Sequence, residues 1–295
     1  MKIRASRREF LKESGFVTAG FLGLQRLITA EASGKLSQKY QSQLKKYGDL
    51  VTDPARILDL PKGFSYKVLS ITGDPMSDGL RTPGRPDGMG AFPGPDGRVV
   101  LVRNHELDDN QTFGSPFGLL NEHLGKVDQE KVFDRGAGVR PQIGGTTNLV
   151  YNPKTAEVER SFLSLAGTAR NCAGGITPWN TWITCEETVI KPDGEKDKDG
   201  DLTRKEKREA RRAARRARKR GEDPKKKKEE DKDKEPNYLE HAHGYNFEVL
   251  ASAEIGLCQP VPLKAMGRFN HEAVAVDPAS GIVYQTEDRD DGLLT

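Results

Sequence analysis

Residues 87–106 read DGMGAFPGPDGRVVLVRNHE: a Pro-Asp-Gly turn at 95–97 leads into an apolar run that ends in Asn104-His105-Glu106. Short runs rich in β-branched and aromatic residues, bounded by turn-forming residues, recur along the chain at 98–103, 147–151, 181–185, 246–250, 273–276 and 282–286. Repeated short strands at this spacing are typical of an all-β sandwich or propeller. We therefore expect an all-β fold.

The first 32 residues have the pattern of an export signal. Ser6-Arg7-Arg8-Glu9-Phe10-Leu11-Lys12 precedes a weakly apolar stretch at 15–24, much shorter than the roughly 20 residues of a membrane-spanning helix. Ala30-Glu31-Ala32 then offers a small-x-small cleavage site. This predicts a twin-arginine signal peptide over 1–32 and a mature domain over 33–295. We expect the twin-arginine translocase as a transient partner, a periplasmic or secreted location, and no stable membrane anchor.

The net charge of +3 comes from one segment of the chain. Residues 191–236 carry 20 of the 47 Lys and Arg residues and 14 of the 44 Asp and Glu residues. Without this segment and the first 32 residues, 21 basic residues stand against 27 acidic ones. Because the body of the protein is acidic, we expect no nucleic-acid partner.

We interpret 191–236 as a charged, low-complexity insertion on one loop, partly helical or disordered. Its residues 195–206 place acids, glycine and an apolar residue as in an EF-hand calcium loop, with acids at positions 1, 3, 5 and 12. A solvated run of charges explains the same residues, and both interpretations stay open. Residues 202–220 favour a helix but have no apolar face, which indicates an exposed helix or a disordered arm.

Metal-ligand residue types gather where the predicted strands end. They are Asn104-His105-Glu106, Asn171-Cys172, Cys185-Glu186-Glu187, Asn270-His271-Glu272 and Glu287-Asp288. Carboxylates at the ends of several strands can converge on one hard cation. Cys172 and Cys185 are 13 residues apart, which favours a disulfide across a hairpin, whereas Cys172 in a glycine-rich turn beside carboxylates could also be a thiolate ligand.

Four stretches resemble the PhoX-type alkaline phosphatases. They are 87–106, already quoted, GTARNCAGGITPWNTWITCEE at 167–187, HGYNFEV at 243–249, and GRFNHEAVAVDPASGIVYQTEDR at 267–289. The resemblance implies a β-propeller that is exported by the twin-arginine route. It also implies hydrolysis of small phosphate esters at a centre of Fe3+ and Ca2+ ions.

Site residues follow from the same motifs. The resemblance implies that Cys172 ligates iron, which reverses the disulfide favoured by spacing, and that Glu187 and Glu272 bridge metals. Glu106 and Asp288 are further candidate metal ligands by the same resemblance. Arg103 and Asn104 are the candidates for facing the phosphate.

The resemblance also implies further blades beyond Thr295, so we expect an incomplete propeller, from a truncated chain that could be inactive. Two alternatives are a calcium-dependent propeller hydrolase such as a lactonase, and a non-catalytic calcium-binding propeller. Neither needs a thiolate ligand, so Cys172 is the residue that separates them from a phosphatase.

Overall fold

The computed structural model describes residues 47–192, 236–292 and 294–295. The predicted signal peptide, nearly all of the insertion at 191–236 and the candidate calcium loop at 195–206 therefore lie outside the described residues. Within the described residues, no helix is long and apolar enough to cross a membrane.

The chain divides into two compact units, Met1–Val68 and Leu69–Thr295. In the described part of the first unit, β1 (Leu50–Val51) pairs antiparallel with β2 (Leu60–Pro61). The Asp53 carboxylate organises the connection between these strands by accepting hydrogen bonds from the main-chain nitrogens of Ala55 and Ile57.

The described residues of the second unit form three antiparallel sheets. The first has four strands in the order β3 (Pro86–Pro93), β4 (Val99–His105), β5 (Gly144–Asn152) and β6 (Glu157–Thr168). The second comprises β7 (Asn171–Ile176), β8 (Thr181–Glu186) and β9 (Asn246–Leu250), and the third comprises β10 (His271–Val276) and β11 (Val283–Glu287). The helical elements of the described residues are three-residue 3-10 turns at Pro95–Gly97, Thr112–Gly114, Leu124–Lys126, Gln129–Lys131, Gly136–Gly138 and Lys264–Met266. The predicted all-β class is confirmed.

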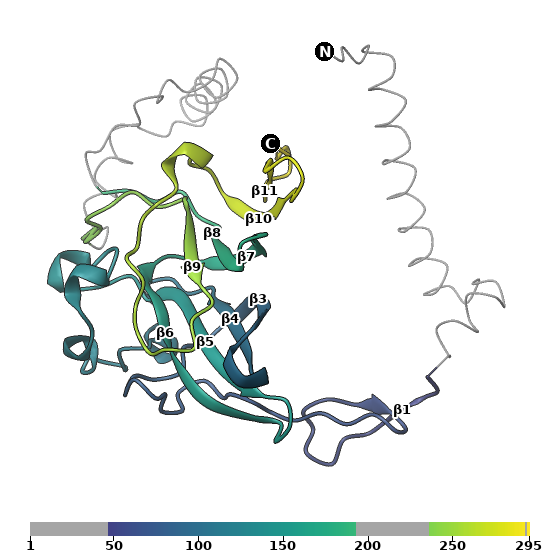
Figure 1. Cartoon of the computed structure of the whole chain (residues 1–295). Coiled ribbons are helices and arrows are strands. Elements are labelled where there is room, and N and C mark those ends of the chain that lie inside the picture. The colour runs from purple at the N-terminus through teal and green to yellow at the C-terminus, as the bar shows by residue number, and fades with distance from the viewer. Residues whose placement is uncertain (1–46, 193–235, 293) are drawn as a thin grey trace, which may run out of the picture. The chain divides into compact units, whose positions relative to one another are not determined.

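The first strands of the three sheets lie together, because β7 packs against both β3 and β10 (Figure 1). The blades of a propeller are four-stranded antiparallel sheets around a common axis, and the first of these three sheets has four strands. The described residues of the second unit contain three sheets and no closed ring, so the propeller itself stays a prediction.

The main core lies between the first two sheets. Alternation along β4 sends Val100 and Val102 to the same face, where they meet Trp182 of β8 and Phe247 of β9. Burying a side chain of this size contributes about 1.5–3 kcal/mol. This core fixes the faces of the sheets, and so fixes which strand-end residues point toward one another.

Every run predicted as a strand contains one, with boundaries shifted by up to three residues. The interpretation of 171–175 as a glycine-rich turn is wrong, because these residues form β7. A Cβ atom on Gly174 would lie 2.0 Å from the carbonyl oxygen of Ile183, and one on Gly175 would lie 2.1 Å from that of Val274. The glycines therefore allow neighbouring strands to approach β7 on both sides. They are required by this close packing and not by a turn.

The charged insertion connects two strands that are neighbours in one sheet. β8 and β9 pair from Thr181↔Leu250 to Cys185↔Asn246, on either side of residues 191–236. The pairing shows that the sheet forms across this segment.

Candidate metal centre

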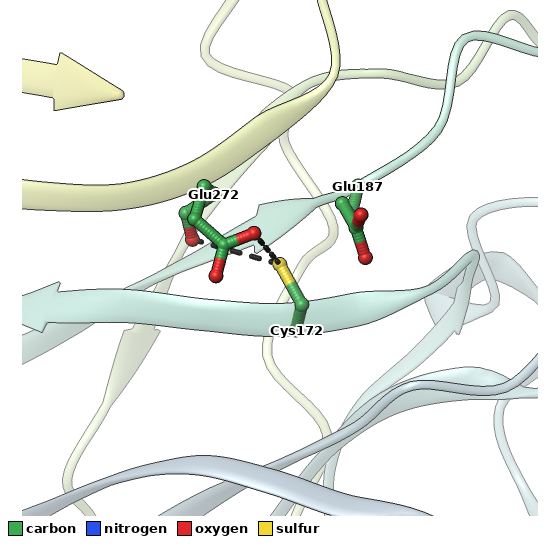
Figure 2. A group of neighbouring side chains, drawn as sticks. All are labelled: Cys172, Glu187 and Glu272. Atoms are coloured by element: carbon green, nitrogen blue, oxygen red, sulfur yellow. Dashed lines mark hydrogen bonds between the residues drawn. The ribbon is translucent and has the colours of Figure 1, made fainter. Parts of the chain in front are cut away.

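Three sequence-predicted ligands, Cys172, Glu187 and Glu272, come together from three elements. Cys172 lies in β7, Glu187 directly follows β8, and Glu272 lies in β10. One ligand atom from each lies within 4.8 Å of the others (Figure 2). A thiol and two carboxylates at this separation can hold a metal ion.

Strand pairing is irregular at two of these three residues, Cys172 and Glu272. The register of β7 against β8 shifts between Asn171 and Gly174, around Cys172. The register of β10 against β11 shifts between His271 and Val274, around Glu272. A bulge re-aims a side chain out of strict alternation, so these two irregularities let both ligands face the same point.

The Cys172 thiol is buried and lies near oxygen acceptors of three residues, Cys185, His271 and Glu272. Its Sγ lies 3.4 Å from the carbonyl oxygen of His271, 3.7 Å from that of Cys185 and 3.8 Å from Oε2 of Glu272 (Figure 2). Burial, and then the charge of Glu272, raise the pKa of Cys172 far above that of a free thiol. A cation bound at the site would favour ionisation of this thiol.

All three cysteines of the chain are free thiols in the structure. Cys172 and Cys185 lie on paired strands, but the thiol of Cys172 points to the carbonyl oxygen of Cys185 and not to its sulfur. The disulfide that the spacing favoured is therefore not formed.

The carboxylates around Cys172 crowd one another. Burial, a hydrogen bond with Asp288 and the charge of Glu272 raise the pKa of Glu187, although Arg170 acts in the opposite direction. Burial and the charges of Asp288 and Asp87 raise the pKa of Glu272. Mutual repulsion of this kind is relieved when a cation binds between the acids. Asp288 and Asp87 thus lie close enough to act on these carboxylates, but outside the group of three whose ligand atoms converge.

Glu106 reaches the edge of this cluster but already has two cationic partners. Its Oε2 lies 2.6 Å from Nη2 of Arg85, and its Oε1 lies 2.9 Å from Nη2 of Arg170. The same Arg170 nitrogen lies 3.3 Å from Oε2 of Glu187. In this arrangement Glu106 orients Arg170 toward a candidate ligand, and direct metal ligation by Glu106 stays a prediction.

The sequence analysis missed Arg170. Its φ is 50°, a left-handed conformation that is costly for a residue with a side chain and that often marks functional sites. Its main-chain oxygen accepts a hydrogen bond from the Glu187 nitrogen at 3.0 Å. Its position two residues before Cys172, in a matched motif, is the signal that could have identified it.

Asn104 contacts the main chain of β7 at Cys172. Its Nδ2 donates to the carbonyl oxygens of Cys172 at 2.9 Å and Ala173 at 2.7 Å, and its Oδ1 accepts from Nε1 of Trp182 at 2.9 Å. These contacts occupy the amide, so in this structure Asn104 positions β7 and does not present its side chain to a ligand.

Arg103 points elsewhere. Successive residues of a strand face opposite sides of a sheet, so Arg103 lies on the face away from Asn104. There its Nη2 is 3.3 Å from Oγ of Ser70 and 3.4 Å from Oγ1 of Thr147. The structure does not bring Arg103 to the cluster, and Arg170 is the guanidinium that lies beside the acids.

The fold and this site define a β-sheet protein in which a buried thiol and two half-buried carboxylates could hold a metal ion. A family model described as alkaline phosphatase PhoX matches residues 45–294. The chain therefore belongs to the PhoX family of alkaline phosphatases.

Comparison with solved structures gives a similar chain from Pseudomonas fluorescens, described as PhoX in complex with vanadate, a transition state analogue. The two chains share 19% identity with a TM-score of 0.45, over 78% of this chain and 46% of the other. This chain thus spans less than half the length of that relative. A comparison with curated proteins gave no match.

Proposed function

We propose that this protein is a metal-dependent phosphatase that hydrolyses phosphate monoesters outside the cytoplasm. The observation that carries the proposal is the meeting of the Cys172 thiol with Glu187 and Glu272, whose ligand atoms lie within 4.8 Å of one another. Membership of the PhoX family supports the reaction class.

The donor set fits two kinds of metal ion. A thiolate together with carboxylates suits a transition metal, and we propose Fe3+ held by Cys172, Glu187 and Glu272. Carboxylate oxygens alone suit Ca2+, and Asp288 adds such a group beside Glu187. Bound cations would neutralise the charge on the phosphate oxygens and on the departing alkoxide.

The chain's own residues prepare this centre. Asn104 fixes the main chain at Cys172 and Ala173 through two hydrogen bonds. Arg170 holds Glu187 through both its guanidinium and its carbonyl oxygen. A preorganised ligand set of this kind lowers the cost of binding a metal, since the ligands need little rearrangement. A direct contact between Arg103 and the phosphate stays part of the proposal, without support from the contacts that the structure gives it.

Export by the twin-arginine route is part of the same proposal. Its support is the sequence from Ser6 to Lys12 and the cleavage pattern at Ala30-Glu31-Ala32. This route carries folded proteins, so iron can be inserted before the protein leaves the cytoplasm.

Substrate assays on the purified chain test the proposal. We expect hydrolysis of p-nitrophenyl phosphate, loss of that activity after metal removal with EDTA, and recovery when Fe3+ and Ca2+ are restored. A lactone substrate is assayed in parallel. Cleavage of the lactone without phosphate release, or a folded, metal-loaded chain with neither activity, would contradict the proposal.

A further inference from the structure

A second group of ionisable side chains lies buried directly behind the metal-centre residues. Glu186 precedes Glu187 at the end of β8, and its side chain is fully buried. Its Oε1 accepts from Nδ1 of His243 at 2.7 Å and from the main-chain nitrogen of Ala169 at 2.9 Å. Its Oε2 accepts from the main-chain nitrogen of Gly244 at 2.7 Å. Glu186 therefore joins three separate stretches of chain.

His243 connects these three stretches to a fourth one, which contains Asp134. Its Nε2 lies 3.2 Å from Oδ2 of Asp134, a residue that is also fully buried. The other oxygen of Asp134 accepts from the main-chain nitrogen of Gly136 at 2.8 Å, and Oδ2 also accepts from those of Glu240 and His241. Both ring nitrogens of His243 thus contact a carboxylate, and each carboxylate is satisfied by main-chain donors.

The charge state of this group follows from its contacts. Burial lowers the pKa of His243, but the two carboxylates outweigh it and raise the pKa to about 9. A protonated imidazole donates from both nitrogens, which matches the two acceptors in place. The cation between two buried anions is held strongly, because removing it leaves two uncompensated negative charges.

The position of Glu186 determines the direction in which the adjacent Glu187 side chain points. Glu186 is anchored inward, so Glu187 must leave the strand in the opposite direction, toward Cys172 and Glu272. The anchor at Ala169 also fixes the residue before Arg170, whose carbonyl oxygen accepts from the Glu187 nitrogen. The hydrogen bonds of Glu186 therefore anchor both its own position, directly before Glu187, and the stretch of chain that holds the Glu187 nitrogen.

We infer that His243, clamped between Asp134 and Glu186, is a positioning residue that aims Glu187 into the metal centre. We call Asp134, His243 and Glu186 together the clamp. The role of Glu187 as a ligand rests on the proposed function, whereas its placement by the clamp does not. Outer partners of metal ligands typically change metal affinity by about 10–100-fold, and we expect an effect of that size.

The test uses three full-length chains: wild type, His243→Gln, and the control Asn148→Ala. Asn148 is buried and, like His243, makes two side-chain hydrogen bonds that join distant segments, to the carbonyl oxygens of Leu250 and Ser252. Co2+ is titrated at pH 7.5 as the probe, and the thiolate-to-cobalt charge-transfer band reports a Cys172 site. Hydrogen exchange of the peptide that contains Glu187 is measured in the metal-free chains.

We expect His243→Gln to weaken Co2+ binding at least 10-fold and to speed exchange at Glu187, while Asn148→Ala changes neither beyond its loss of global stability. Wild-type affinity and exchange in His243→Gln would overturn the inference. If that variant does not fold, Asp134→Asn, which keeps the shape of the clamp, must shift both readouts in the same direction. A wild type without a cobalt band, but with exchange that depends on His243, refutes the proposed metal site and leaves the clamp supported.

Discussion

Raising the pH through the titration of His243 is expected to destabilise the folded chain. The imidazole lies between Asp134 and Glu186. Nε of Arg268 donates to the main-chain carbonyl oxygen of His243 at 2.7 Å. Burial of the ring disfavours its charge, but the two carboxylates outweigh this effect. The folded state therefore favours the protonated ring.

The magnitude follows from the pKa of His243, which the fold raises from 6.5 to about 9. Each unit of pKa difference corresponds to about 1.36 kcal/mol, so the protonated ring contributes roughly 3 kcal/mol. Because the folded pKa is the higher one, this contribution is fully present below pH 6.5. It is lost as the pH rises through 9.

Urea unfolding of the metal-free chain at pH 6, 7.5 and 10, followed by the fluorescence of its tryptophans, measures this effect. The free energy of unfolding should fall by about 3 kcal/mol more in the wild type than in His243→Gln over this range. Equal pH dependence in the two proteins would refute the reasoning, since it would show that His243 does not titrate as a clamped cation.

Further substitutions test other parts of the structure. Arg170→Gln is expected to weaken metal binding by about 10–100-fold, measured by metal titration, whereas Arg98→Gln at the Glu159 ion pair should have no effect. Gly88→Ala should cost about 1–3 kcal/mol in urea unfolding, because its Cβ would lie 2.8 Å from Cα of Ala173, while Gly125→Ala meets nothing within 4 Å and should be neutral. Replacing the arginine pair at 7–8 by lysines should keep the protein in the cytoplasm, as cell fractionation would show. Export of that variant at the normal rate would contradict the twin-arginine prediction.

The sequence allowed the all-β class to be predicted because turn-forming residues separate its short apolar runs. It was a poor guide to β7, because Gly174 and Gly175 have the composition of a turn. Glycine is required there by the close approach of two neighbouring strands, which is a property of the packed structure and not of the local sequence.

The candidate site shows the same limit. Motifs identified Cys172, Glu187 and Glu272, and the structure brings them together. Motifs could not show that Asn104 and Arg103, although adjacent, face opposite sides of their sheet with different partners. The contacts of Arg170 also depend on residues 17 and 64 positions away, so spacing alone could not reveal them.

The clamp could not be predicted from the sequence for a similar reason. Asp134 and His243 are 109 residues apart, and Glu186 was quoted only as part of a motif. A buried carboxylate that accepts several main-chain hydrogen bonds cannot be distinguished in the sequence from a neighbouring metal ligand, because both are glutamates.

The iron content of purified chains tests the central claim most directly. Wild type, Cys172→Ser and Cys258→Ser are compared by elemental analysis, with Cys258 as the matched control because it is a free thiol outside the cluster. We predict iron in the wild type and in Cys258→Ser, and its loss in Cys172→Ser. Equal iron in all three proteins, or a folded wild type without iron, would contradict a centre built on the Cys172 thiolate.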